Sequence, residues 1–257
     1  MSKSYFAVSA RSAIGLARSG NEDSAMTSSS LLAVADGMGG HAGGEVASHI
    51  AIKTLATMVP VFSSADIDTD SIEDLLLNSL HTIDDEISRT ASDEIELRGM
   101  GTTLTALLIR DGRLALLHVG DSRCYRLRGN TFEQLTHDHT VLQELLDSGA
   151  ISVAEARDHP QRSMLTQVLM GEGSVVPVLM VYEVNSKDRF LLCSDGLSSV
   201  LTEKEIKTLL KKSNREEAVD ALVEATYING APDNVTVLVA DVIEDDLHSV
   251  QLLGAAT

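Results

Sequence analysis

Basic side chains are scarce in this chain of 257 residues, in which 20 Lys and Arg residues stand against 38 Asp and Glu residues. The formal net charge of −18 creates a long-range field that repels phosphate backbones and anionic lipid. We therefore expect no nucleic-acid partner and no membrane partner. The remaining composition, with 44% hydrophobic and 23% charged residues, is typical of a globular protein.

Cysteine and long hydrophobic runs are also nearly absent. The two cysteines, Cys124 and Cys193, lie inside apolar runs, where a free thiol usually packs as a small hydrophobic group. Two cysteines do not make a disulfide framework, so export to an oxidising compartment is not indicated. No apolar run approaches the ~18 residues of a membrane span, and the first residues lead into no signal-peptide core. We expect a cytoplasmic protein.

The hydrophobic pattern alternates between strand-like and helix-like segments. Strands are predicted at residues 6–10, 31–35, 104–109, 114–119, 124–127, 178–184, 190–193 and 235–242, and helices at 44–58, 72–87, 203–210 and 216–227. The pairs Asp111-Gly112 and Gly129-Asn130 are turn sequences that favour antiparallel hairpins. We predict an α+β fold, with one domain over residues 1–245 and a C-terminal tail, residues 246–257, that is mobile.

Aspartates stand at the ends of the most apolar strands. Asp36, Asp121 and Asp195 each end an apolar run, and Asp233 stands just before another. Taken singly, an aspartate before glycine is a turn former, as in Asp111-Gly112. Several carboxylates near core depth repel one another and are costly to desolvate, and a bound cation removes that cost. Oxygen ligands indicate Mg²⁺ or Mn²⁺, whereas zinc would require more histidine or cysteine.

Six short segments, in order along the chain, resemble those of the bacterial metal-dependent Ser/Thr protein phosphatases (type 2C, the PPM family). They are residues 15–24 (GLARSGNEDS), 33–45 (AVADGMGGHAGGE), 101–103 (GTT), 118–123 (HVGDSR), 192–197 (LCSDGL) and 232–236 (PDNVT). A single segment would be weak evidence, but six in order are strong. The resemblance implies a four-layer α-β-β-α sandwich of two antiparallel sheets flanked by helices.

The resemblance also implies a metal-dependent hydrolase of phosphoserine and phosphothreonine monoesters. Asp36 would bridge two Mn²⁺ or Mg²⁺ ions, the Gly37 carbonyl would bind one of them, and Asp195 and Asp233 would bind the other. Asp121 resembles the ligand of a third, weaker ion in bacterial members. A hydroxide that bridges two ions is a nucleophile at neutral pH, suited to in-line attack on a phosphate monoester.

Three further residues receive roles from the same resemblance. Arg18 resembles a phosphate-binding arginine, and a guanidinium is a natural bidentate clamp for a phosphoryl group. Asp23 resembles an outer-shell residue that orients metal-bound water. His41 is a candidate for substrate contact or proton transfer, and the alternative is a histidine that caps the following helix.

Residues 138–172 are too polar for the core and resemble the flap subdomain of bacterial members. We expect this flap to govern which phosphoproteins are accepted, with Arg162 as a candidate contact for acidic phosphopeptides. The alternative is a structural lid. The expected partners are phosphorylated proteins, targets of a bacterial Ser/Thr kinase, and we expect a monomer.

Two other functions compete with this interpretation. Residues 37–42 also fit the G-x-G-x-x-[GA] dinucleotide fingerprint, which would indicate an oxidoreductase. Residues 60–64, however, do not continue as a clear second parallel strand, and the predicted hairpins disagree with a doubly wound sheet. An inactive relative that only binds phosphoproteins would lack metal ligands, and here every proposed ligand is present.

Overall fold

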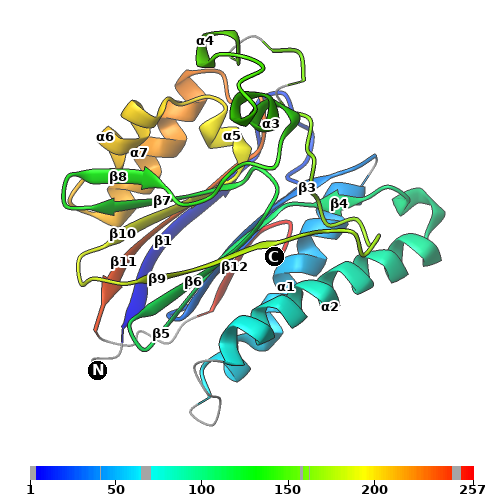
Figure 1. Cartoon of the computed structure of the whole chain (residues 1–257), viewed down its shortest axis with the longest axis horizontal. Helices are drawn as coiled ribbons and strands as arrows, with labels where there is room; N and C mark the ends of the chain where they lie inside the picture. Colours follow the sequence, from blue (N-terminus) through cyan, green and yellow to red (C-terminus); the bar gives the residue numbers. More distant parts are fainter. Residues whose placement is uncertain (1–3, 41, 65–70, 157–158, 162, 245–249) are drawn as a thin grey trace.

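The computed structural model describes residues 4–40, 42–64, 71–156, 159–161, 163–244 and 250–257. His41 and Arg162, two predicted site residues, therefore lie outside the described residues. Figure 1 shows two sheets that face each other, with helices on the outer side of each. This arrangement confirms the predicted α+β sandwich of four layers.

The first sheet has five antiparallel strands in the order β1-β11-β10-β7-β8. Their bounds are Tyr5–Ala13 (β1), Val235–Ile243 (β11), Arg189–Cys193 (β10), Arg123–Arg128 (β7) and Thr131–Gln134 (β8). Three helices cover the outer face, namely α5 (Asp195–Ser198), α6 (Glu203–Leu210) and α7 (Arg215–Ile228). Buried side chains such as Leu191 and Val237 pack there against Ile206 and Leu222.

The second sheet follows the order β12-β2-β3-β5-β6-β9, and β4 pairs with β3 beside it. Its strands are Gln251–Gly254 (β12), Asp23–Thr27 (β2), Leu31–Met38 (β3), Gly101–Thr102 (β4), Leu104–Arg110 (β5), Arg113–Val119 (β6) and Val178–Glu183 (β9). The long helices α1 (Gly43–Phe62) and α2 (Ile72–Asp93) cover its outer face, and a short 3-10 helix, η2 (Ile95–Leu97), follows them. Two short helices, α3 (Val141–Asp147) and α4 (Val153–Ala156), lie at one end of the sandwich.

Successive side chains along the central strands point to opposite faces of the sheet and so pack into two different cores. In β3, Leu32 and Val34 face the other sheet, whereas Leu31 and Ala33 face the helices α1 and α2. Both faces of such a strand are buried, which explains why it appears in the sequence as a continuous apolar run rather than as an alternating one. The predicted Asp111-Gly112 turn is confirmed, because both residues have positive φ (48° and 78°) between antiparallel β5 and β6.

The C-terminal residues differ from the prediction of a mobile tail. β12 pairs with β2, with Leu252 opposite Met26 and Leu253 opposite Ala25. Leu253 and Ala256 are buried in the cores on either side of the sheet. The end of the chain therefore completes the second sheet, because β12 pairs with the edge of β2 opposite β3.

Cys124 and Cys193 are both free and buried, as predicted. Among the helices of the described ranges, none combines the length and apolarity needed to cross a bilayer.

Candidate metal centre

Asp36 and Asp23 meet because their strands are neighbours. Asp23 in β2 stands directly opposite Asp36 in β3. The Asp36 amide donates to Thr103 Oγ1 at 3.0 Å, and the Asp36 carbonyl accepts from Thr102 Oγ1 at 3.0 Å and from the Thr103 amide at 2.9 Å. The two threonines of the GTT segment therefore fix the backbone that carries Asp36.

Asp195 and Asp233 approach from the other sheet. Asp195 follows β10 and begins α5, and Asp233 stands just before β11. A Cβ on Gly196 would lie 1.8 Å from the carbonyl oxygen of Asn234, so the two aspartate-bearing segments are in direct backbone contact. Only glycine permits this approach, which explains the glycine after Asp195.

Asn234 joins this pair of segments to the loop before β2. Its side-chain Nδ2 donates to the carbonyl of Gly20 at 2.9 Å, and its Oδ1 accepts from the amide of Glu22 at 3.0 Å. Asn234 thereby places the loop that carries Arg18 beside the aspartates. The Arg18 guanidinium contacts Asp233, with Nη2 2.5 Å from Oδ2, while nearly half of the Arg18 side chain remains exposed (46%).

Asp121 lies at the edge of a cavity of about 370 Å³ at the same end of the sandwich. It follows β6 after Gly120, whose φ of 105° allows the turn to lie against Thr103. The cavity is lined by Asp121, Arg123, Asp138, Thr140, Leu142, Gln143, Leu146, Ala156, Ser163, Asp195, Ser198 and Ser199. Two of the predicted ligands, Asp121 and Asp195, therefore share one solvent-accessible space with α3.

The aspartates raise one another's pKa values. Burial raises the pKa of Asp36 well above its ordinary value, and the charges of Asp23 and Asp195 raise it further. Burial and then the charge of Asp195 raise the pKa of Asp121 to about 8. Burial and then Asp233 raise the pKa of Asp195. A cation would offset the cost of ionising these buried, mutually repelling carboxylates.

Asp23 lies deepest in the group, with an exposed fraction of 1%. Burial raises its pKa to about 7, although the hydroxyl of Ser194 donates to Asp23 Oδ2 at 2.7 Å and favours the ionised form. The same hydroxyl oxygen accepts from the Thr236 amide at 3.0 Å. Asp23 is thus held firmly behind Asp36, where it can hold a proton or orient a water molecule.

The aspartates surround the centre without forming a closed ligand set. Within the described residues, no three His, Cys, Asp or Glu side chains converge as a ready metal site. Asp233 is paired with Arg18, whose guanidinium Nη2 lies 2.5 Å from Asp233 Oδ2. The donors are all oxygen, and burial and mutual repulsion raise the pKa values of Asp36, Asp121 and Asp195. This set fits Mg²⁺ or Mn²⁺ and does not fit zinc.

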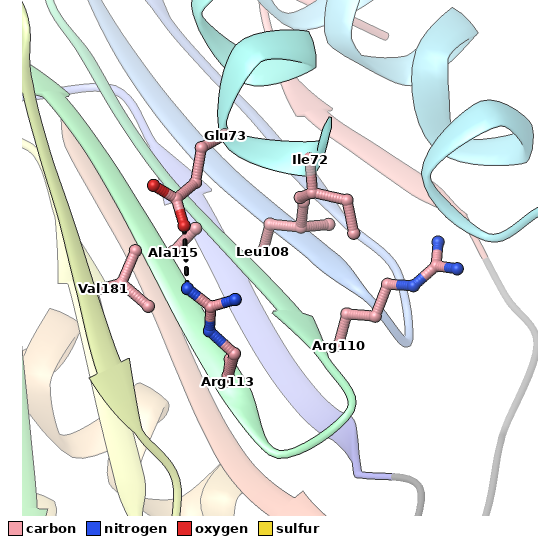
Figure 2. A pocket seen from close by; sticks show the side chains of 7 residues that line it. All are labelled: Ile72, Glu73, Leu108, Arg110, Arg113, Ala115 and Val181. Carbon is pink, nitrogen blue, oxygen red and sulfur yellow. Dashed lines mark hydrogen bonds and ion pairs between the residues drawn. The ribbon is translucent and has the colours of Figure 1, made fainter. Parts of the chain in front are cut away.

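A second hollow is unrelated to the aspartates. It measures about 20 Å³, enough for about one water molecule, and lies between α2 and the strands β5, β6 and β9 (Figure 2). Its polar lining includes an ion pair between Glu73 Oε1 and Arg113 Nη2 at 2.9 Å. The centre at the end of the sheets is therefore the candidate site.

Comparison with known proteins places the chain in a family. Residues 21–227 match the family model described as Protein phosphatase 2C. The chain belongs to the protein phosphatase 2C family.

Two curated relatives of this phosphatase 2C family member extend the comparison. Over 253 residues it is 43% identical to the serine/threonine protein phosphatase PstP of Mycobacterium tuberculosis, a match that covers 96% of this chain and 48% of that protein. Over 212 residues it is 37% identical to the serine/threonine phosphatase stp of Listeria monocytogenes, covering 82% of this chain and 84% of that protein. The chain therefore spans about half the length of the mycobacterial relative.

Solved structures agree with the fold. The crystal structure of the Mycobacterium tuberculosis phosphatase PstP/Ppp matches with a TM-score of 0.87 at 43% identity, covering 92% of this chain and 98% of that one. The PstP catalytic domain in complex with two manganese ions matches with a TM-score of 0.86 at 40% identity, covering 93% and 99% of the two chains. At such identities, the shared sandwich reflects common ancestry.

Several residues of this phosphatase 2C family member carry contacts that the sequence did not reveal. Thr103 and Asn234 stand inside the quoted segments 101–103 and 232–236, and this membership was an available signal. Asp138 pairs with Arg123 across 15 residues of chain, and no local pattern predicted it. Glu22 lies against Gly44, because a Cβ added to Gly44 would be 2.6 Å from Glu22 Oε2. Burial raises the pKa of Glu22.

Proposed function

We propose that this member of the protein phosphatase 2C family is a metal-dependent serine/threonine protein phosphatase that hydrolyses phosphoserine and phosphothreonine monoesters. The observation that carries the proposal is the cluster of buried carboxylates with raised pKa values at one end of the two sheets, beside Arg18. Family membership and a related catalytic domain that binds two manganese ions support it.

The proposed metal-binding residues are those that the resemblance implied. Asp36 would bridge two Mn²⁺ or Mg²⁺ ions, with the Gly37 carbonyl on one ion and Asp195 and Asp233 on the other, and Asp121 would hold a third. When bound, the ions supply an activated water nucleophile at neutral pH and neutralise charge on the phosphoryl and leaving oxygens.

The chain's own residues orient the substrate. Arg18 stands half exposed beside Asp233, so its guanidinium is available to bind two oxygens of a phosphoryl dianion. Asp23, held by Ser194, would orient the attacking water. His41 remains a proposed contact for substrate or proton transfer.

Phosphate release from a phosphothreonine peptide tests the proposal. We expect release by the purified chain with Mn²⁺ or Mg²⁺, and none after excess chelator, because the carboxylates alone cannot activate water. Release that is insensitive to chelator would contradict the proposal. Tight nicotinamide binding would favour the oxidoreductase, and peptide binding without turnover would favour an inactive relative.

Arg18→Ala should chiefly raise KM. A clamp on the phosphate acts in the ground state and the transition state alike, so its loss weakens binding more than it slows chemistry. We expect KM for p-nitrophenyl phosphate to rise about tenfold or more, the order expected for a lost charge-assisted hydrogen bond. Arg11→Ala is a control, because Arg11 forms its ion pairs with Glu216 and Asp220 on α7. An unchanged KM in Arg18→Ala would exclude the clamp.

The flap, residues 138–172, is proposed to choose among phosphoproteins without supplying chemistry. Thr140 caps α3 by accepting the Gln143 amide at 3.1 Å, and none of the residues of α3 is fully buried. α3 supplies Leu142, Gln143 and Leu146 to the wall of the cavity that also contains Asp121. A partly exposed segment beside a rigid site is suited to recognition. Contact between Arg162 and acidic phosphopeptides stays a prediction.

Replacing residues 147–162 with a short Gly/Ser linker tests this role. We expect p-nitrophenyl phosphate turnover to stay within about tenfold of the original, while the ranking of phosphopeptides by kcat/KM changes, since only remote binding is removed. An unchanged ranking in a folded variant would favour the structural lid. Complete loss of small-substrate turnover would show that the flap helps to build the site.

Phosphorylated proteins are the proposed substrates. Their phosphorylation by a bacterial Ser/Thr kinase, a monomeric state and a cytoplasmic location stay predictions. Size-exclusion chromatography coupled to light scattering measures the oligomeric state directly.

A further inference from the structure

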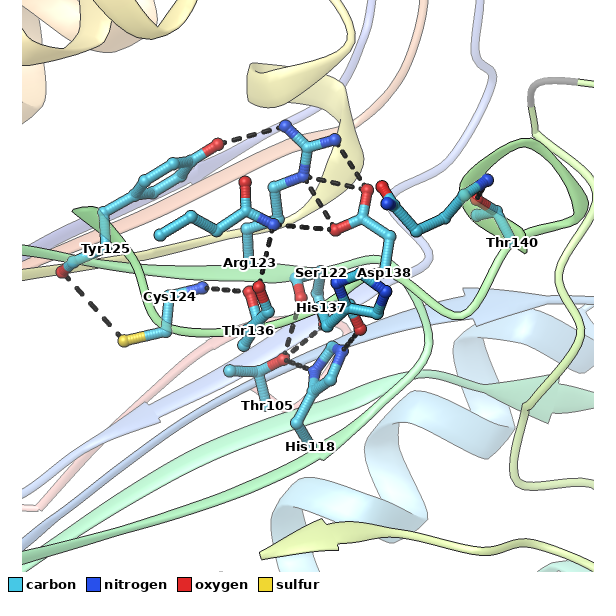
Figure 3. A network of polar contacts seen from close by, with 12 residues as sticks. Thr105, His118, Ser122, Arg123, Cys124, Tyr125, Thr136, His137, Asp138 and Thr140 are labelled. Atoms are coloured by element: carbon cyan, nitrogen blue, oxygen red, sulfur yellow. Dashed lines mark hydrogen bonds and ion pairs between the residues drawn. The ribbon is translucent and has the colours of Figure 1, made fainter. Parts of the chain in front are cut away.

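The turn that carries Asp121 is joined to the segment that leads into the flap. The Gly120 amide donates to His139 Nδ1 at 3.1 Å, and the His139 amide donates to the Gly120 carbonyl at 2.8 Å. Two residues earlier in each segment, His118 Nε2 lies 3.1 Å from the carbonyl oxygen of His137. Figure 3 shows His118 on β6 beside His137, in the chain that follows β8.

A buried ion pair reinforces this junction. Arg123 Nε lies 2.9 Å and 3.0 Å from the two carboxylate oxygens of Asp138, and Nη2 lies 2.6 Å from Oδ2. Gln134 Nε2 also donates to Asp138 Oδ1 at 3.0 Å, and Arg123 Nη1 donates to the hydroxyl of Tyr125 at 3.1 Å. Asp138 is 8% exposed and the Arg123 side chain is 25% exposed, so the pair is largely buried, and its several hydrogen bonds fix its geometry.

Both members of the pair line the same cavity as Asp121. Arg123 and Asp138 stand beside Asp121 and Asp195 in the lining, and Thr140, Leu142 and Gln143 supply the wall on the flap side. Only Ser122 separates Arg123 from Asp121 in the chain. The charges of Asp138 and Arg123 also act on Asp121 in opposite directions, raising and lowering its pKa. The pair therefore connects the flap to the one predicted ligand that lies outside the two-ion centre.

The other end of the flap has a separate anchor, which provides a matched comparison. Asp84 on α2 is buried, and its two carboxylate oxygens accept the amides of Gly171 at 2.7 Å and Gly173 at 2.9 Å. Asp84 is not among the described residues that line the cavity. A change at Asp84 thus loosens the flap without touching the Asp121 turn.

We propose that Arg123 and Asp138 form a positioning pair that holds Asp121 in place for the third metal ion by locking its turn to the start of the flap. The inference rests on the proposed function, since it concerns how one proposed ligand is oriented. Neither residue touches the reacting atoms. Their effect passes through the backbone of residues 120–123 to the Asp121 carboxylate.

Calorimetric titration of the full chain with Mn²⁺ tests the proposal independently of activity. We expect Asp138→Asn to weaken the weakest Mn²⁺ site by about tenfold or more while the tighter sites keep their affinity, a loss typical of residues that orient a ligand. Asp138→Glu keeps the charge and should restore part of the affinity. Asp84→Asn should match the unaltered chain within about twofold.

Steady-state kinetics with p-nitrophenyl phosphate give a second readout. Asp138→Asn should lower kcat by about tenfold with KM nearly unchanged, because the clamp on phosphate is untouched. If Asp138→Asn does not fold, Arg123→Lys serves instead, since it keeps the positive charge but loses the planar fork.

A folded Asp138→Asn or Arg123→Lys chain with an unaltered Mn²⁺ isotherm and kcat would overturn the inference. An equal loss in Asp84→Asn would also overturn it, because anchoring of the flap in general would then be the cause. If the unaltered chain hydrolyses no phosphoester with Mn²⁺, the proposed function fails, whereas the calorimetric comparison still decides the role of the pair.

Discussion

Asp36→Asn should lower kcat/KM for p-nitrophenyl phosphate by more than about 100-fold, beyond the loss typical of residues that only orient a ligand. Asp36 is the carboxylate proposed to serve two ions at once, and an amide keeps its shape but loses the charge. Burial and then the charges of Asp23 and Asp195 raise the pKa of Asp36, so a bound cation would offset the cost of ionising this carboxylate. Steady-state kinetics at saturating Mn²⁺, with Mn²⁺ calorimetry, measure both consequences.

Asp111→Asn is the matched control for this substitution. Asp111 also follows an apolar strand and precedes a glycine, but it lies in the β5–β6 turn with φ of 48°, a conformation that asparagine tolerates. Its kcat/KM should stay within about twofold, as for surface changes away from a site. If Asp36→Asn retained most of its activity, the proposal that Asp36 binds both metal ions would be wrong.

Gly196→Ala should damage both stability and activity. The added methyl group would stand 1.8 Å from the Asn234 carbonyl oxygen, so one of the two backbone segments must move. Such overpacking lowers the free energy of unfolding by about 1–3 kcal/mol. The movement also separates Asp195 from Asp233, and a displacement of about 1 Å at a reacting centre can reduce kcat by about 100-fold. Urea denaturation and steady-state kinetics measure the two effects.

Gly20→Ala isolates the steric cause. Gly20 belongs to the same neighbourhood, since its carbonyl accepts from Asn234, yet a Cβ there meets no atom within 4 Å. We expect its stability to change by less than about 0.5 kcal/mol and its kcat to remain near the original. If Gly196→Ala behaves like Gly20→Ala, the close approach of the two segments is not needed for function.

Much of the fold followed from local chemistry. Asp111-Gly112 predicted a hairpin because both positions require positive φ, and the structure has it. The apolar runs ending in Asp36 and Asp195 predicted strands that lead to a site. β2 was not predicted, because its sequence, DSAMT, carries no alternating pattern although all of its residues are buried. β12 was not predicted either, since its pairing with β2 spans more than 220 residues of chain.

For the candidate site too, some features were predictable from the sequence and others were not. The sequence by itself determined which carboxylates end strands, since strand propensity and turn chemistry depend on neighbouring residues. Only the tertiary structure decided that Asp23 stands opposite Asp36 in the sheet. It also decided that Arg18 forms an ion pair with Asp233 and that Asp138 forms one with Arg123. These contacts join residues that are distant in sequence, so they depend on the register of the sheets and on the packing between segments. The depth of burial that raises the carboxylate pKa values arises only when both sheets and their helices exclude water together.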